Sequence, residues 1–256
     1  MNLDAFRKTY PVTRFTIAGP IAEMGRTGGR QSPAILLPGA QGTAEIFFKQ
    51  LTVLGAQRDV VAVTYPAWTD AAALADFVVL LADKLGFARF DLVGSSFGGH
   101  VAQWMAAYHP DRIRKLVVGN SFADPAPLQS PERLAAVRDK EADTLKAEAM
   151  GRLEASPAGE LRDVLLDLVG HHQPADLLKS RMLGVQMAKP VPQLALPEDR
   201  ILLIECDNDP LVSPPVREAM RRHYAGARCE TISGGGPYPS LVKSAQSNAP
   251  LNPFPS

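Results

Sequence analysis

Short, largely apolar runs recur along the 256-residue chain, and their spacing restricts its fold more than any other feature. Most of these runs are continuous rather than alternating, which is typical of parallel strands covered on both faces. They occupy residues 34–37, 60–63, 90–93, 116–118 and 201–204, with a last strand expected at 228–232. Helical stretches at 44–54, 70–85 and 98–109 lie between them. This alternation predicts an α/β fold with a mostly parallel sheet and helices on both faces.

The weaker signals concern the two ends of the chain. Residues 15–18 are a shorter strand candidate, and the glycine-rich, polar stretch 25–32 favours a loop. A helix is expected near residues 214–224, and the segment after Ser247 is too rich in proline for a final helix.

One interval departs from the alternation. From residue 122 to 197 no buried strand run occurs, and the composition shifts to Ala, Leu, Glu, Lys and Arg at helical spacing. We therefore expect an α/β core at residues 1–122 and 198–256, with a helical cap or lid inserted at 123–197.

Composition excludes several functions. The 27 Lys and Arg residues balance the 27 Asp and Glu residues, so a basic surface for nucleic acid or anionic membrane is not expected. No apolar run approaches the roughly 18 residues of a membrane span, and the first residues lack the apolar segment of a signal peptide. We expect a cytoplasmic protein with two reduced cysteines, no metal and no cofactor. The oligomeric state stays open.

The sequence GSSFGG at residues 94–99 carries the main chemical signal, because it joins a predicted strand directly to a predicted helix. In this context G-x-S-x-G is typical of a nucleophile elbow, which presents a serine hydroxyl at the carboxyl end of a sheet. Ser96 is then the candidate nucleophile. The same residues would also fit a tight turn that only packs a helix on a strand.

Two further loops fit this interpretation. Residues 38–42 follow the first strong strand, where the backbone N–H of Ala40 or Gln41 would join that of Phe97 in an oxyanion hole. Asp209 follows a later strand and is the candidate acid, with Asp207 as the alternative. Ordinary polar turns are the alternative interpretation of both loops.

Taken together, these motifs make the chain similar to α/β-hydrolase-fold proteins. Longer stretches, FRKTYP at 6–11, GTAEIFF at 42–48, NSFAD at 120–124 and GGPYPSL at 235–241, resemble the maspardin group. The resemblance implies an eight-stranded, mostly parallel sheet. That group is known more for protein association and trafficking than for a defined substrate.

The sequence departs from a hydrolase at the catalytic base. A serine nucleophile needs an imidazole to accept its proton. The resemblance implies a histidine after a Gly-Gly pair that follows the last strand, but in this chain Gly235 and Gly236 are followed by Pro237. His223 and His109 are expected at distant helix ends, and His100 is expected to pack rather than react. His171 and His172, in the predicted cap, are the possible alternative bases.

Three functions remain open. The first is weak, unconventional serine-hydrolase activity on an ester or acyl compound. The second is a non-catalytic binding or adaptor protein that uses the same pocket and cap. The third is non-hydrolytic oxyanion-hole chemistry, such as cyclisation, proton transfer or decarboxylation. The expected partner is accordingly a small acyl or ester ligand or another protein.

Overall fold

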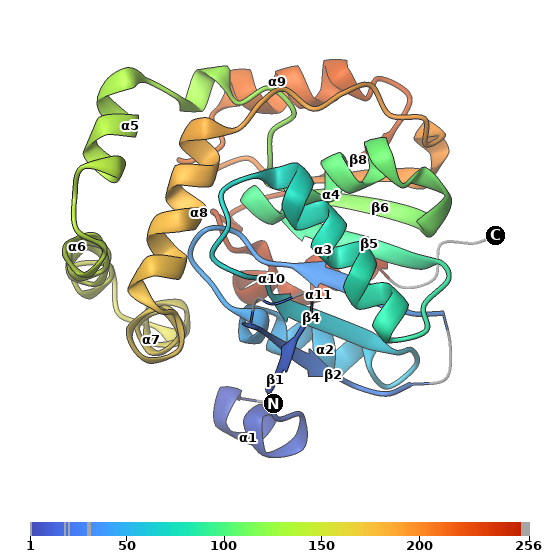
Figure 1. Cartoon of the computed structure of the whole chain (residues 1–256), viewed down its shortest axis with the longest axis horizontal. Coiled ribbons are helices and arrows are strands. Elements are labelled where there is room, and N and C mark those ends of the chain that lie inside the picture. The colour runs from blue at the N-terminus through green and yellow to red at the C-terminus, as the bar shows by residue number, and fades with distance from the viewer. Residues whose placement is uncertain (1, 18, 20, 30–31, 252–256) are drawn as a thin grey trace.

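The computed structural model describes residues 2–17, 19, 21–29 and 32–251. Their strands form one eight-stranded sheet in the order β1-β2-β4-β3-β5-β6-β7-β8 (Figure 1). The strands are β1 (Thr13–Thr16), β2 (Ile21–Arg26), β3 (Ala34–Leu37), β4 (Val60–Thr64), β5 (Phe90–Ser95), β6 (Ile113–Gly119), β7 (Ile201–Cys206) and β8 (Arg228–Ile232). Strands β3 to β8 pair in parallel, whereas β1 pairs with β2 and β2 with β4 in antiparallel fashion. The predicted α/β-hydrolase fold with a mostly parallel sheet is confirmed.

Helices cover both faces of this sheet. In chain order they are α1 (Leu3–Thr9), η1 (Ala44–Phe47), α2 (Phe48–Leu54), α3 (Ala71–Lys84), α4 (Phe97–Tyr108), η2 (Pro110–Arg112), η3 (Ala126–Leu128), α5 (Pro131–Arg138), α6 (Ala142–Glu154), α7 (Glu160–Asp167), η4 (Leu168–His172), α8 (Ala175–Met187), η5 (Glu198–Arg200), α9 (Pro214–His223), α10 (Pro239–Val242), α11 (Ser244–Asn248) and η6 (Ala249–Leu251).

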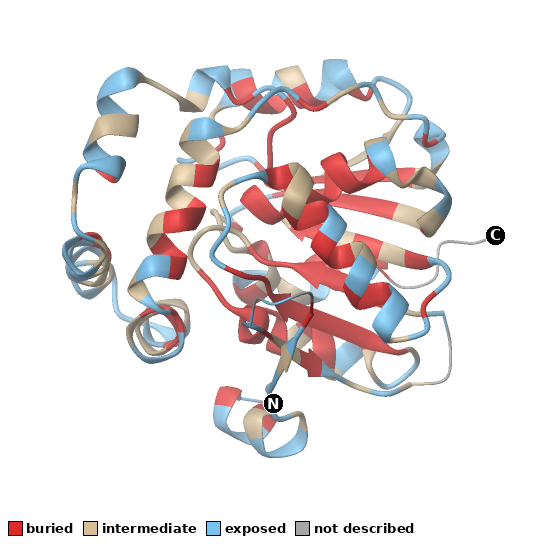
Figure 2. Ribbon diagram, viewed as in Figure 1, coloured by how far each residue is buried: buried red, intermediate tan, exposed pale blue. Residues whose placement is uncertain are grey.

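The central strands are buried on both sides because their successive side chains enter two separate cores (Figure 2). In β3, Ile35 and Leu37 belong to the core beneath α3, α4 and α9. Ala34 and Leu36 belong to the opposite core, beneath α1, α2 and α10. This two-sided burial explains why the apolar runs are continuous rather than alternating.

The amino-terminal region differs from the expectation. Strand β2 was not predicted, and Gly25 and Arg26 belong to it rather than to a loop. The strand lacks an apolar run because it lies between an exposed edge strand and β4, and Arg26 pairs with Asp59. Strand β1 ends at Thr16, while Ala18, the last residue of the predicted strand, lies outside the described residues.

The segment after Ser247 is more helical than expected. Helix α11 ends at Asn248, and the short 3-10 helix η6 follows at Ala249–Leu251, where Pro250 is compatible with a single short turn. Residues 252–256 of the proline-rich segment lie outside the described residues.

Helices α5 to α8 lie between β6 and β7 in the chain and stand together on one side of the sheet (Figure 1). Of these, α8 lies nearest the sheet, and α5 and α6 lie farther out with largely exposed outer faces (Figure 2). Gly184 of α8 faces the ring of Phe97, and a Cβ there would lie 2.5 Å from Phe97 Cζ. The insertion thus approaches the start of α4. Across the described residues, no helix is long and apolar enough to cross a membrane.

Candidate active site at the carboxyl edge of the sheet

Ser96 occupies a strained turn between β5 and α4. Its φ of 52° and ψ of −122° make it one of two described non-glycine residues with positive φ. The backbone is held by hydrogen bonds from Ser96 N to Gly119 O at 2.8 Å and from Ser121 Oγ to Ser96 O at 2.7 Å. The Ser96 hydroxyl has no hydrogen-bond partner among the described residues. The fold therefore fixes the backbone of this serine, while its hydroxyl is available to bind another group.

Three glycines make this turn possible by removing side chains from crowded positions. A Cβ on Gly98 would lie 2.3 Å from Leu37 O, and one on Gly94 would lie 2.3 Å from Gly98 O. On Gly39 the Cβ would lie 3.0 Å from Ser96 Cβ and 3.6 Å from Ser96 Oγ. The loop after β3 is thus pressed directly against the serine.

The loop at residues 38–42 is held by three side chains through its carbonyl oxygens. Tyr65 Oη donates to Pro38 O at 2.6 Å. Arg181 Nη1, from α8, donates to Gly39 O at 3.2 Å and also to Gly42 O. Burial raises the pKa of Tyr65, so this phenol remains a donor.

Gln173 supplies the third set of contacts. Its Nε2 donates to Ala40 O at 2.7 Å, and its Oε1 accepts from Gly42 N at 3.2 Å. In a trans peptide the carbonyl and the following N–H point in opposite directions. Because the carbonyls of Gly39 and Ala40 face Arg181 and Gln173, the N–H groups of Ala40 and Gln41 point away from those side chains.

Asp209 follows β7 and is buried. Its Oδ1 accepts from the backbone N–H of Leu211 at 2.8 Å and of Val212 at 3.3 Å. Arg217 of α9 fixes this loop by donating to Val212 O at 2.7 Å and to Asp207 O at 3.1 Å. The other oxygen of Asp209 has no hydrogen-bond partner within the described ranges, so it is the oxygen still able to bind another group.

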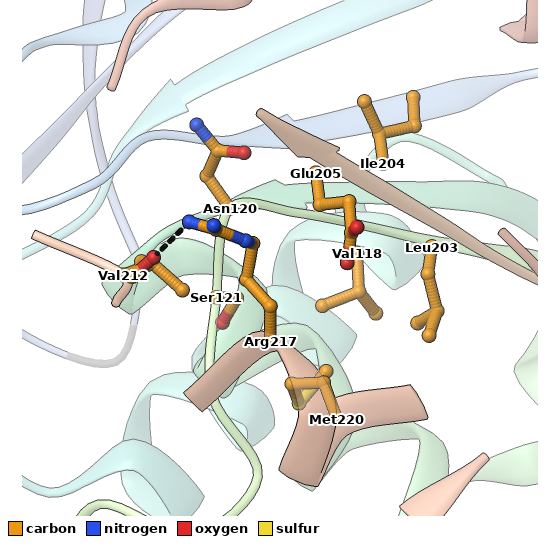
Figure 3. Close-up of a pocket in the computed structure, with 9 residues that line it drawn as sticks. All are labelled: Val118, Asn120, Ser121, Leu203, Ile204, Glu205, Val212, Arg217 and Met220. Carbon is orange, nitrogen blue, oxygen red and sulfur yellow. Dashed lines mark hydrogen bonds between the residues drawn. The ribbon is translucent and has the colours of Figure 1, made fainter. Parts of the chain in front are cut away.

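Arg217 also lines a small cavity between β6, β7 and α9, and Figure 3 shows its guanidinium directed at the Val212 carbonyl. The other lining residues are Val118, Asn120, Ser121, Leu203, Ile204, Glu205, Val212 and Met220. The cavity underlies the loop that carries Asp209.

Asp207, the alternative acid, has a different environment. It is exposed and accepts from Ser233 Oγ at 2.7 Å and Gly234 N at 3.1 Å. These hydrogen bonds lower its pKa. Asp207 thus joins the loops after β7 and β8.

The loop with Pro237 is fastened to the neighbouring strand ends. Asn120, the second residue with positive φ, donates from Nδ2 to Gly236 O at 2.8 Å and accepts from Cys206 N at 2.9 Å. Asn208 Oδ1 accepts from Gly236 N at 2.8 Å. Pro237 and the next residue line a groove against α7 and the end of α6.

Tyr238, next to the proline, was not predicted as a site residue. Its hydroxyl donates to Gln41 Oε1 at 3.2 Å, and burial together with the Asp209 carboxylate raises its pKa. Tyr238 is therefore a hydrogen-bond donor rather than a base at neutral pH. It connects the loop after β8 to the predicted oxyanion loop.

His100 is fully buried, and both ring nitrogens are engaged. Its Nδ1 lies 3.2 Å from Phe122 O, and its Nε2 accepts from Trp104 Nε1 at 3.0 Å. Burial lowers its pKa to about 4. The predicted packing role accounts for all of these contacts.

His171 and His172 end the π-helical turn η4. His171 Nδ1 is 3.9 Å from Asp167, and His172 lies 3.9 Å from Glu45 and 3.7 Å from Asp167. Their neighbouring acids also bind Arg7. In the described part of the chain neither histidine hydrogen-bonds Ser96, and their role as alternative bases stays a prediction.

The two remaining histidines lie at helix ends. His109 Nε2 is 3.0 Å from Asp76, and the ring of His223 stacks edge-on against Tyr224. Among the described residues, therefore, no imidazole hydrogen-bonds the Ser96 hydroxyl.

The sheet, its helices and the turn at Ser96 define an α/β hydrolase, and the chain belongs to that family: the model described as the alpha/beta hydrolase family matches residues 34–244. A solved structure titled as a hydrolase from Pseudomonas aeruginosa shares the fold at a TM-score of 0.78, with 20% identity over 95% of this chain and 99% of that one. The enol-lactonase from Burkholderia xenovorans gives a TM-score of 0.75, with 18% identity over 93% and 98% of the two chains.

Within the family, the chain is similar to maspardin. The proteins from Homo sapiens and Danio rerio are each 26% identical to it over 255 residues, which cover 95% of this chain and 82% of maspardin. The resemblance to the maspardin group predicted from the motifs is confirmed.

Proposed function

We propose that this chain binds an acyl or ester compound at Ser96 and reacts with it slowly, as a serine-hydrolase-type protein without an imidazole base. Ser96 would be the nucleophile, Asp209 the acid, and the N–H groups of Phe97 and Ala40 or Gln41 the oxyanion donors. Residues 123–197 would form the cap over the ligand.

The Ser96 turn is the observation that carries this proposal. A non-glycine residue at φ 52° costs free energy that a plain packing turn could avoid with glycine. Here the strained residue has a free hydroxyl, and Gly39 leaves space beside it. The loop at residues 38–42 adds support, because the N–H groups of Ala40 and Gln41 point away from Arg181 and Gln173 and are not used by these side chains.

The reaction would be slow because nothing in the described residues takes the serine proton efficiently. Loss of one triad member typically lowers kcat by roughly four to six orders of magnitude, and the oxyanion hole and binding leave about 10³ to 10⁴ over water. Pro237 cannot accept a proton, and Tyr238 is held protonated.

A specific observation also favours the non-catalytic alternative. Both nitrogens of His100 are engaged, and His171 and His172 face Glu45 and Asp167 instead of Ser96. A protein that only binds its ligand would need no base. The two functions differ in whether any measured reaction depends on the Ser96 hydroxyl.

A fluorophosphonate probe tests the proposal directly. We expect slow labelling of the wild-type chain, located at Ser96 by mass spectrometry, and none in Ser96→Ala. Ser95→Ala is the matched control, because it removes a neighbouring hydroxyl from the same turn, and it should label like the wild type. Equal labelling of wild type and Ser96→Ala, or labelling of neither, would reject the proposed reaction at Ser96.

A further inference from the structure

Arg181 is the one fully buried arginine in the described residues, with none of its surface exposed. It lies on α8, with its guanidinium carbon 4.2 Å from the centre of the Tyr65 ring. Burial lowers its pKa, but an arginine remains protonated in proteins. No carboxylate in the described ranges forms a salt bridge with it, so a full positive charge is buried opposite carbonyl oxygens and an aromatic ring only.

One edge of this guanidinium is unused. Nη1 donates to Gly39 O and Gly42 O, whereas Nε and Nη2 have no hydrogen-bond partner among the described residues. Nε and Nη2 form the edge that matches the two oxygens of a carboxylate. Leaving these donors buried and unpaired is costly.

Other arginines of this chain show what that edge binds. Arg7 uses Nε and Nη2 to grip the two oxygens of Glu45 at 2.9 and 2.8 Å. Arg26 grips Asp59 with the same pair of nitrogens. In Arg181 the same two nitrogens, Nε and Nη2, have no carboxylate bound to them among the described residues.

A purely structural role does not require this charge. Gln173 holds the adjoining carbonyl of Ala40 with a neutral amide, so the loop at residues 38–42 can be fixed without a cation. The charge and the free edge of Arg181 are therefore unexplained by its contacts to Gly39 and Gly42.

Arg181 lies close to the proposed nucleophile. It hydrogen-bonds Gly39, and a Cβ added to Gly39 would lie 3.6 Å from Ser96 Oγ. One helical turn farther along α8, Gly184 packs on Phe97, the residue after Ser96. These contacts place Arg181 and α8 beside the turn that carries Ser96.

We propose that the ligand of this site carries a carboxylate, which binds the Nε and Nη2 edge of Arg181. The placement beside the reacting group rests on the proposed function of Ser96, whereas carboxylate binding itself does not. Because the edge is covered by protein, the ligand enters when α8 shifts away from the loop at residues 38–42.

Calorimetric titration of the whole chain with glutarate, adipate and butyrate tests the proposal, with dimethyl glutarate as the uncharged probe. We expect at least one carboxylate to bind. Dimethyl glutarate should bind at least about tenfold more weakly than glutarate, since hydrogen bonds between charged groups contribute this much affinity. Arg181→Lys keeps the charge but removes the paired donors, and should weaken binding about tenfold. Arg181→Met should abolish it.

The control is Arg152→Met, which removes an exposed arginine from α6 and should leave binding unchanged. Circular dichroism and thermal melting show whether each variant folds; if Arg181→Met does not, Arg181→Lys decides. The proposal is wrong if no carboxylate binds the wild type, if the diester binds equally well, or if the folded Arg181 variants bind as the wild type does. Carboxylate binding that persists in Ser96→Ala, without probe labelling of the wild type, would retain this inference and reject the reaction at Ser96.

Discussion

The indole N–H of Trp104 donates to His100 Nε2 at 3.0 Å, one turn along the same helix. The other ring nitrogen faces Phe122 O, and the imidazole stacks on the Phe122 ring at a centroid distance of 4.7 Å. The histidine nearest to Ser96 in sequence is thus part of the core. Because His100 is buried, it does not act as a catalytic base, and it makes the free energy of unfolding depend on pH.

We expect acid to destabilise the wild type through His100. Above pH 6.5 the imidazole is neutral in both folded and unfolded chains, so its contribution to stability is complete. Between pH 6.5 and about 4 the unfolded chain gains a proton that the folded chain refuses, and the free energy of unfolding falls. At pH 4.5 this loss reaches about 2–3 kcal/mol.

Urea denaturation at pH 7.0, 5.5 and 4.5 measures this effect. His100→Gln should be less stable than the wild type at pH 7 but lose less stability on acidification. His223→Gln, at the exposed end of α9, should keep the wild-type slope. Parallel pH profiles for wild type and His100→Gln would contradict the assignment.

Gly98→Ala should prevent the close crossing of α4 and β3. The added Cβ would lie 2.3 Å from Leu37 O and 2.5 Å from Pro38 O, which are backbone atoms that cannot rotate away. We expect a loss of about 3 kcal/mol or more in the free energy of unfolding, or no folded protein. Gly151→Ala on α6 has nothing within 4 Å of its Cβ and should instead raise stability by about 0.5–1 kcal/mol. Similar effects of both substitutions on chemical denaturation would count against this packing.

Asn120 combines strain with hydrogen bonding, and two substitutions separate them. Asn120→Ala loses the bonds to Gly236 O and Cys206 N while keeping a side chain at φ 40°, and should cost about 2–4 kcal/mol of stability. Asn120→Gly loses the same bonds but relieves the backbone, and should be about 1 kcal/mol more stable than the alanine variant. Equal denaturation midpoints for the two variants would show that the strain is negligible.

Pro237→His places an imidazole at the position where the sequence predicts that the base has been lost. If the site is a hydrolase lacking that group, hydrolysis of p-nitrophenyl butyrate should rise about tenfold to hundredfold, the lower part of what a positioned base supplies. The double variant Ser96→Ala, Pro237→His should show no such rise. An increase that survives removal of Ser96, or none at all in folded protein, would argue against a dormant triad.

The sequence alone determined the features that depend on local pattern. Continuous apolar runs predicted β3 at its observed bounds and β4, β5 and β7 to within two residues, because strands buried on both faces tolerate few polar side chains. Strand β6 begins three residues before its predicted run, because Arg114 and Lys115 interrupt the apolar pattern. GSSFGG predicted the turn at Ser96, since only glycine fits where backbones cross. Strand β2 escaped prediction because an antiparallel strand near the sheet edge mixes polar and apolar residues.

Only the tertiary structure decided what surrounds Ser96. Arg181 and Gln173 lie more than 130 positions along the chain from the loop they hold, and no local pattern marks either of them. Tyr238 was visible only as the neighbour of Pro237. Hydrogen-bond partners depend on which loops the sheet brings to one edge, and that long-range placement is set by packing of the whole fold. The same packing decided that His100 belongs to the core, although its position one turn from Ser96 was already evident in the sequence.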